Sequence, residues 1–156
     1  MKYREYLVRW IRGPLGVLLV AIIVLFGLIV YAPLANRNSK ADVLQVNGRS
    51  FLLQIARTEQ ERELGLGKRA SMPANQGMLF VFDQVQPECF WMKDMHFSLD
   101  IIWINANKQV MYIKDDVSPR TYPDSFCPTQ SVKYVIELNA GIADNTDMKV
   151  GETLDF

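Results

Sequence analysis

The 156-residue chain has few of the side chains on which most hydrolytic and zinc-dependent chemistry depends: it contains one histidine and two cysteines. A serine or cysteine nucleophile needs an activating base, and His96 lies in a methionine-rich segment with no nucleophile motif around it. Two cysteines and one histidine also cannot complete a closed tetrahedral zinc site without carboxylates. The sequence therefore shows no catalytic triad and disfavours a structural zinc site.

The chain also lacks an excess of positive charge. Of its 17 basic and 17 acidic residues, four basic residues and one acidic residue precede a long apolar run, which leaves 13 basic against 16 acidic residues beyond it. A mildly acidic region without a basic stripe has little with which to neutralise a phosphate backbone, so nucleic acid is not an expected partner. Gly65-x-Gly67 falls at an expected helix end and lacks the spacing of a phosphate-binding loop.

The apolar run extends from Leu15 to Ala32 without a charged residue. At about 1.5 Å per helical residue it nearly crosses a hydrocarbon core of roughly 30 Å. The basic residues ahead of it predict a cytoplasmic N-terminal end and an extracytoplasmic C-terminal part. We therefore expect a single-pass protein of the cell membrane, with the lipid bilayer as one partner and four segments: a cytoplasmic end (1–14), a transmembrane signal anchor (15–32), a linker (33–41) and a globular domain (42–156).

A cleaved signal peptide is the alternative interpretation of this segment, because Ser39-Lys40-Ala41 has small residues where a signal peptidase requires them. The run is longer than the roughly 7 to 15 apolar residues of a signal peptide, and the candidate cleavage site lies well beyond its end. We therefore favour the uncleaved anchor. Either outcome exports the domain.

The domain reads as an α+β fold dominated by antiparallel sheet, with one or two short helices and with closure into a small barrel as one possible form. Asn47-Gly48 predicts a tight hairpin between strands at 43–46 and 51–56. Thr58 and Glu61 have the spacing of a capping box at the start of a helix that ends near Gly65 or Gly67. Short apolar or β-branched runs predict further strands, and residues 105–108 form a four-residue hairpin loop. These runs lie at 78–82, 89–92, 99–104, 110–117, 133–138 and 152–156.

A connection at 116–132 contains three prolines and Cys127, which predicts a long irregular loop. Cys89 and Cys127 both lie on the exported side, where an oxidising compartment permits a disulfide. Such a bond would close a loop of about 39 residues, which the chain-entropy model values at roughly 4 kcal/mol. The alternative is two unrelated thiols.

Several separated motifs occur in an order that resembles the domain of unknown function 192 family, over roughly residues 55–156. They are Gly65-Leu66, Arg69, the segment 77–82, Phe90-Trp91-Met92-Lys93, the segment 99–102, Cys127-Pro128, the segment 135–138, Ala140-Gly141 and Gly151-Glu152. The resemblance implies a small, often exported or anchored domain with a compact mixed sheet and one or two helices, and it implies no particular activity. The sequence departs from the family pattern in two places: Asp94-Met95 replaces the usual Asn-Thr, and Gly67 replaces a usual Met.

The segment from Trp91 to Asp100 is the strongest candidate for a binding site. On an extended chain Trp91 and Lys93 project to one face, and a cation beside an aromatic ring, with nearby acidic side chains, suits a small ligand. The candidate ligand-binding residues are Arg69, Trp91, Lys93, Asp94 and Asp100. The competing structural interpretation places Trp91 and Met92 in the core, lets Asp100 satisfy backbone donors, and pairs Lys93 with Glu137 or Asp100.

Two further interpretations belong to other functional classes. An enzyme would use Asp100 or Glu137 as a general base, with Lys93 or Arg69 stabilising negative charge. A copper(I) site would draw on thiolate, thioether and imidazole ligands, namely Cys89, Met92, Met95 and His96. Met92 and Met95 face opposite ways on a regular strand, and a disulfide would consume the Cys89 thiolate. We therefore expect no cofactor, and a small ligand or an envelope component as the partner of an anchored binding module.

Overall fold

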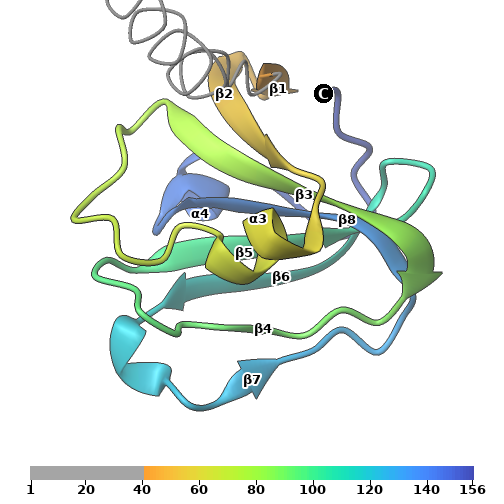
Figure 1. Ribbon diagram of the computed structural model, residues 1–156. Helices are drawn as coiled ribbons and strands as arrows, with labels where there is room; N and C mark the ends of the chain where they lie inside the picture. Colours follow the sequence, from red (N-terminus) through yellow and green to blue (C-terminus); the bar gives the residue numbers. More distant parts are fainter. Residues whose placement is uncertain (1–40) are drawn as a thin grey trace, which may run out of the picture. The chain divides into compact units, whose positions relative to one another are not determined.

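The structure is a computed structural model that describes residues 41–156 (Figure 1). The predicted cytoplasmic end, the predicted span at 15–32 and the linker up to residue 40 lie outside the described residues. Within 41–156, none of the helices has the length and apolar character needed to cross a membrane. The elements, in chain order, are β1 (Ala41–Val46), β2 (Arg49–Ala56), α3 (Glu59–Leu64), β3 (Gln76–Gln86), β4 (Phe90–Trp91), β5 (Leu99–Ile104), β6 (Val110–Val117), η1 (Pro119–Thr121), β7 (Ser125–Phe126), β8 (Val132–Asn139) and α4 (Ile142–Asn145).

Six strands form one sheet in the order β1-β2-β3-β8-β5-β6, and β4 pairs with β7 in a separate two-stranded ribbon. All pairs in the sheet are antiparallel except β2 with β3, which are parallel and connected through α3. In Figure 1 the β4–β7 ribbon runs along the lower margin of the view, below β6. The mainly antiparallel α+β prediction is confirmed. The barrel alternative is wrong, because β1 and β6 remain separate edges of an open sheet.

Local sequence signals place the first hairpin and α3 where the sequence predicts them. Asn47 and Gly48 both have positive φ, as a tight hairpin turn requires. At the start of α3, Thr58 Oγ1 accepts a hydrogen bond from the Glu61 backbone N–H at 3.2 Å, and Glu61 Oε2 accepts one from the Thr58 N–H at 3.0 Å. This reciprocal pair is the predicted capping box, and the helix ends at Gly65 with φ +49°.

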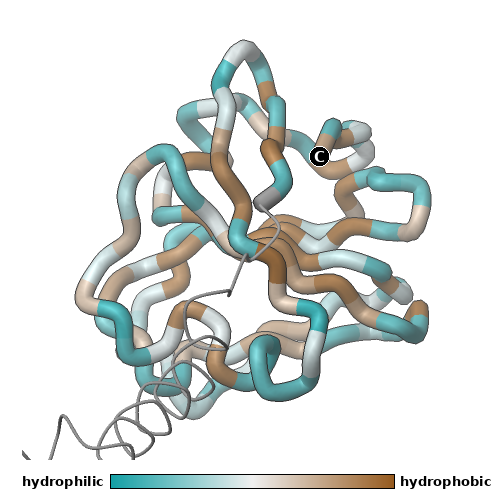
Figure 2. Tube along the Cα trace, turned by 45° about the horizontal axis from the view of Figure 1, so that its top comes forward, coloured by the Kyte–Doolittle hydropathy of each residue, from teal (hydrophilic) through white to brown (hydrophobic). Residues whose placement is uncertain are grey.

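Apolar side chains cover both faces of the sheet. Strand β5 is buried throughout and alternates between the faces, so that Ile102 and Ile104 belong to one core cluster while Ile101 and Trp103 belong to the other. Figure 2 shows the consequence along the chain: hydrophobic stretches follow the central strands, and hydrophilic ones gather in the connecting loops. The second cluster lies on the face that carries the candidate site.

Two predicted strands are not formed as expected. Residues 152–156 make only isolated bridges, from Asp155 to Gln45 and from Thr153 to Gln109, so the predicted C-terminal strand is wrong. The extended conformation predicted from Trp91 to Asp100 is also wrong beyond β4. The chain turns after Met92, whose carbonyl accepts a hydrogen bond from the Met95 N–H, and Asp94 adopts a positive φ of 58°. Short polar side chains tolerate this left-handed conformation, which ends the strand.

The predicted disulfide is confirmed between Cys89 and Cys127, whose Cα atoms lie 4.3 Å apart. It joins the segment before β4 to the segment after β7, next to the pairing of Phe90 with Phe126. The connection between β6 and β8, residues 118–131, is irregular apart from η1 and β7, as predicted for most of the range 116–132. The bond therefore ties the long loop to the strand that carries Phe90 and Trp91.

Candidate functional site

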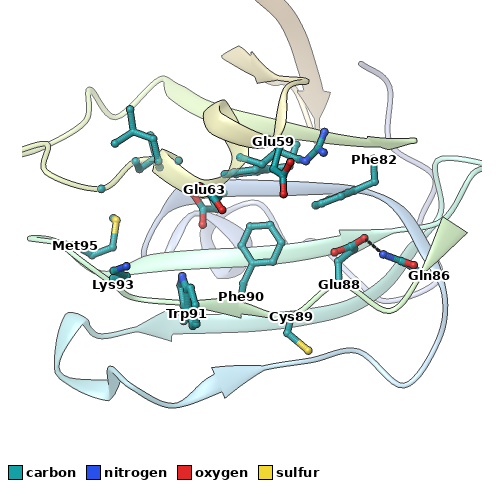
Figure 3. A pocket seen from close by; sticks show the side chains of 17 residues that line it. Glu59, Glu63, Phe82, Gln86, Glu88, Cys89, Phe90, Trp91, Lys93 and Met95 are labelled. Atoms are coloured by element: carbon teal, nitrogen blue, oxygen red, sulfur yellow. Dashed lines mark hydrogen bonds between the residues drawn. The ribbon is translucent and has the colours of Figure 1, made fainter. Parts of the chain in front are cut away.

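A pocket with a volume of about 350 Å³ opens between α3, β3 and the segment that contains β4. This volume lies near the lower end of the range for small-molecule sites, which is about 300–1,000 Å³. Glutamate and aromatic side chains dominate its lining, seen in Figure 3. The lining residues are Glu59, Arg62, Glu63, Leu64, Gly65, Leu66, Gly67, Phe80, Phe82, Gln86, Glu88, Cys89, Phe90, Trp91, Lys93, Met95 and Glu137.

Regular periodicity places pairs of these side chains on one face of their helix or strand. On α3, Glu59 and Glu63 are four residues apart and therefore share one face of the helix. On β3, Phe80 and Phe82 are two residues apart and point to the same side of the sheet. Gly65 allows the helix end to approach the sheet, because a Cβ atom there would lie 3.3 Å from the Phe80 ring.

Glu137 contributes the most unusual group of the pocket. It lies on β8 opposite Met78 of β3 and Ile101 of β5, and only 5% of its surface is exposed. Its Oε2 atom is buried and has no hydrogen-bond partner among the described residues. Burial raises the pKa of this carboxyl from 4.5 to about 8, and the charge of Arg69 opposes the rise only in part. At neutral pH the group is therefore mostly protonated, and it can both donate and accept a hydrogen bond.

The mouth of the pocket carries Trp91 and Lys93. Trp91 is 53% exposed, which makes the prediction that it fills the core wrong, whereas Met92 is buried as expected. The Lys93 ammonium lies 5.9 Å from the centre of the Trp91 ring, a cation–π distance. The predicted proximity of these two side chains is therefore present, although a turn produces it and strand alternation does not. Within residues 41–156, Lys93 forms no ion pair with Glu137 or Asp100.

Asp100 lies away from the pocket. It is fully buried on β5, and strand alternation places it on the same face as Ile102, opposite to the face of Ile101 and the pocket. Its carboxyl accepts backbone hydrogen bonds from Asp116 at 2.9 Å, Gly141 at 3.1 Å and Ala143 at 2.8 Å. Asp100 therefore performs the structural role considered for it: it fixes the start of α4 to the sheet.

Arg69 and Asp94 lie near the pocket but do not line it. One Arg69 Nη atom donates a hydrogen bond to Gln54 Oε1 at 2.9 Å, and its charge acts on Glu137. Asp94 contributes its backbone carbonyl, which accepts a hydrogen bond from the Lys68 N–H at 2.8 Å. Of the five candidate ligand-binding residues, Trp91 and Lys93 thus line the pocket, and Arg69 acts on it electrostatically.

The disulfide affects the copper(I) alternative directly. The Cys89 thiolate on which that alternative depended is bonded to Cys127, and Met92 is buried in the core cluster. The described lining of the pocket contains no hydroxyl, imidazole or free thiol group, so its reactive side chains are carboxyl groups and the Lys93 amine. What remains is one buried, protonatable carboxyl, a surrounding set of charges and several aromatic faces. Such a set is suited to the binding of a small molecule.

The sequence predicts Glu137 as a possible general base or as a structural partner of Lys93, and it does not assign Glu59, Glu63, Phe82 or Phe90 to a site. The signals were present, as an acidic pair at helical spacing and a phenylalanine pair at strand spacing. Each of these patterns is common on its own. Only the pairing of β3 with β8 and the position of α3 over the sheet bring them together.

Comparisons with known proteins agree with this fold. A protein from Sinorhizobium meliloti 1021, described as a proposed transcription regulator, is 27% identical with a TM-score of 0.70, and the match covers 75% of this chain and 94% of that one. A protein of unknown function from Novosphingobium aromaticivorans DSM 12444 is 26% identical with a TM-score of 0.70, covering 74% of this chain and 85% of that one. No curated protein matches the chain. The model of the DUF192 family, described as an uncharacterised ACR, matches residues 42–156. The chain therefore belongs to the DUF192 family, as its motifs indicate.

Proposed function

We propose that this protein is a membrane-anchored binding module that holds a small ligand in the Glu137 pocket. The unpartnered, buried Oε2 atom of Glu137 is the observation that carries the proposal. An unsatisfied buried polar atom costs about 1–3 kcal/mol, and a ligand that hydrogen-bonds to it would remove that cost. The aromatic walls supply apolar contact for the remainder of the ligand.

The proposal places the pocket outside the cytoplasm. The apolar run at 15–32 and the basic residues before it favour a single-pass anchor with a cytoplasmic N-terminal end. The disulfide between Cys89 and Cys127 supports an oxidising environment for the domain. The ligand is then a small molecule, or a group on an envelope component, that is accessible from the outer side of the membrane.

A thermal-shift screen of the full chain in lipid nanodiscs tests the binding proposal. The screen uses small single-ring aromatic compounds that are cationic, neutral or anionic, with empty nanodiscs as the blank. Glu63→Trp places an indole on the pocket side of α3, and Gln60→Trp places the same indole on an exposed position of that helix outside the pocket.

We expect at least one compound to raise Tm in the wild type and in Gln60→Trp, with the shift lost in Glu63→Trp, because bound ligand stabilises the folded state. An equal shift in Glu63→Trp would place the binding elsewhere. The absence of a shift for every compound would overturn the proposal.

A further inference from the structure

The pocket lining carries more acidic than basic side chains, and both basic side chains already have partners. Four of the 17 lining residues are glutamates and two are basic. Arg62 is already occupied: its Nη1 atom donates to the Arg57 and Val81 carbonyls, and its guanidinium lies 5.2 Å from the centre of the Phe82 ring. Lys93 lies over the Trp91 ring at the mouth. Both basic side chains of the lining therefore already have contacts, with backbone carbonyls and the Phe82 ring for Arg62 and with the Trp91 ring for Lys93.

The four glutamates differ in their hydrogen-bond partners. Glu88 accepts a hydrogen bond from the Gln86 side chain at 2.8 Å. Glu59 and Glu63 have no hydrogen-bond or ion-pair partner among the residues that the structure describes, and Glu137 Oε2 is unpartnered and buried. In Figure 3 the carboxylates of Glu59 and Glu63 point from α3 towards the side on which Phe90 lies.

The acidic pair on α3 carries an energetic cost that a ligand could offset. Like charges four residues apart on a helix are destabilising. Glu59 and Glu63 both line the pocket from a helix of only six residues. The helix carries a third acidic side chain, Glu61, which forms the capping box. A positive charge between Glu59 and Glu63 would turn their repulsion into attraction.

The aromatic lining favours the same kind of ligand. Phe82, Phe90 and Trp91 border the cavity together with Met95. The faces of aromatic rings attract cations, and Arg62 and Lys93 already lie over Phe82 and Trp91. Among the described residues, Phe90 has no basic side chain over its ring and is therefore the ring that a ligand cation can use. An anion entering the pocket would meet the Glu59 and Glu63 carboxylates. A neutral ligand would leave their mutual repulsion unchanged.

We propose that the pocket is selective for an organic cation, namely an amidinium, guanidinium or alkylammonium group on a small apolar body, with its charge held between the α3 carboxylates and Glu137. This inference rests on the proposed function and specifies the class of ligand. The apolar body lies against Phe82 and Phe90, and the cationic head extends towards Oε2 of Glu137, which is buried and has no partner among the described residues.

The test compares three probes of the same shape and different charge: benzamidine, benzamide and benzoate. Affinities for the full chain in nanodiscs are measured by isothermal titration calorimetry against empty nanodiscs. We expect benzamidine to bind about tenfold or more tightly than benzamide, since a hydrogen bond to a charged group is worth about 1.5–3 kcal/mol. Benzoate is expected to bind more weakly than either.

Three variants complete the test. Glu137→Gln and Glu63→Gln are each expected to weaken benzamidine binding by about tenfold, because each replaces a carboxyl group that carries or can acquire a negative charge with a neutral amide. Asp83→Asn is the matched control, since Asp83 is exposed and does not line the pocket. It should leave the affinity unchanged.

The outcomes separate this inference from the proposed function. If benzamide or benzoate binds as tightly as benzamidine, cation selectivity is overturned while the pocket remains a binding site. If benzamidine binds tightly but Glu137→Gln and Glu63→Gln leave its affinity unchanged, other residues hold the charge and the inference is also overturned. If none of the three probes binds, both the inference and the proposed function lose their support.

Discussion

Among the described residues, Glu137 and Asp100 are the two buried acidic side chains, and their surroundings differ. Asp100 receives three backbone hydrogen bonds, whereas Glu137 has an oxygen without a partner. A buried carboxyl group that accepts several backbone hydrogen bonds is stabilised by those bonds. A carboxyl without them is retained at a cost in free energy, which is the reason for assigning Glu137 to the binding site and Asp100 to the structure.

Replacement of Glu137 should change how stability depends on pH. Its pKa is about 8 in the folded chain and 4.5 without burial, so the folded state holds a proton that the unfolded state has lost between these values. Its contribution to stability is therefore complete below about pH 4.5 and declines as the pH rises through 8, by up to about 1.4 kcal/mol per pH unit.

Urea denaturation of the wild type and Glu137→Gln at several pH values measures this effect. The difference in unfolding free energy between the two proteins should move steadily in favour of Glu137→Gln from pH 5 to pH 8, since glutamine has no proton to lose. A difference that stays constant over this range would show that the carboxyl titrates normally.

Replacement of Asp100 should destabilise the domain at every pH at which it folds. Asp100→Asn weakens or removes hydrogen bonds from Asp116, Gly141 and Ala143, and we expect a loss of about 2–4 kcal/mol. Asp83→Asn, at an exposed position, is the control. If Asp100→Asn kept full stability and lost affinity for a ligand of the pocket, the structural assignment would be wrong.

At the scale of elements, local signals in the sequence were sufficient where one segment determines its own structure. Asn47-Gly48 and the Thr58–Glu61 capping box each act within a few residues, and both elements form as predicted. The prediction of an extended chain from Trp91 to Asp100 was wrong for a physical reason. Apolar alternation favours a strand, but only Phe90 and Trp91 pair with another strand, β7. Without a partner the chain turns at Asp94.

The ribbon of β4 and β7 depends on the disulfide. Two paired residues provide little pairing energy, so the Cys89–Cys127 bond holds this wall of the pocket in place. The double variant Cys89→Ser, Cys127→Ser should lose about 2–4 kcal/mol of stability, measured as a fall in Tm. It should also lose affinity for any ligand that contacts Trp91. An unchanged Tm would mean that the ribbon is held by its side-chain packing alone.

At the scale of the whole molecule, the sequence predicted the family, the α+β class and the disulfide, but it did not predict the pocket. The lining comes from three separate parts of the chain, at 59–67, 80–95 and 137. Phe80 approaches Glu137 only because β3 pairs with β8, more than fifty residues further along the chain. No local pattern encodes that pairing, so a single sequence shows the residues of the site but does not show that they lie close together in space.

The predicted anchor at 15–32 leads to a test of the complete chain. The full-length protein should remain with the membrane fraction after an alkaline carbonate wash, because a spanning helix is held by burial of its apolar side chains. Removal of residues 1–32 should release it. In intact spheroplasts, added protease should reach the domain and not the N-terminal end. Release of the full-length protein by the wash would contradict the anchor.

The central claim is that Glu137 is a neutral carboxyl whose free oxygen serves a ligand. An infrared titration of the full chain in nanodiscs, with the same titration of Glu137→Gln subtracted, isolates the band of its protonated form. We predict that this band disappears with a midpoint near pH 8, and that saturating benzamidine lowers the midpoint, because a bound cation favours the ionised form. A midpoint near 4.5 that does not respond to benzamidine would contradict the account.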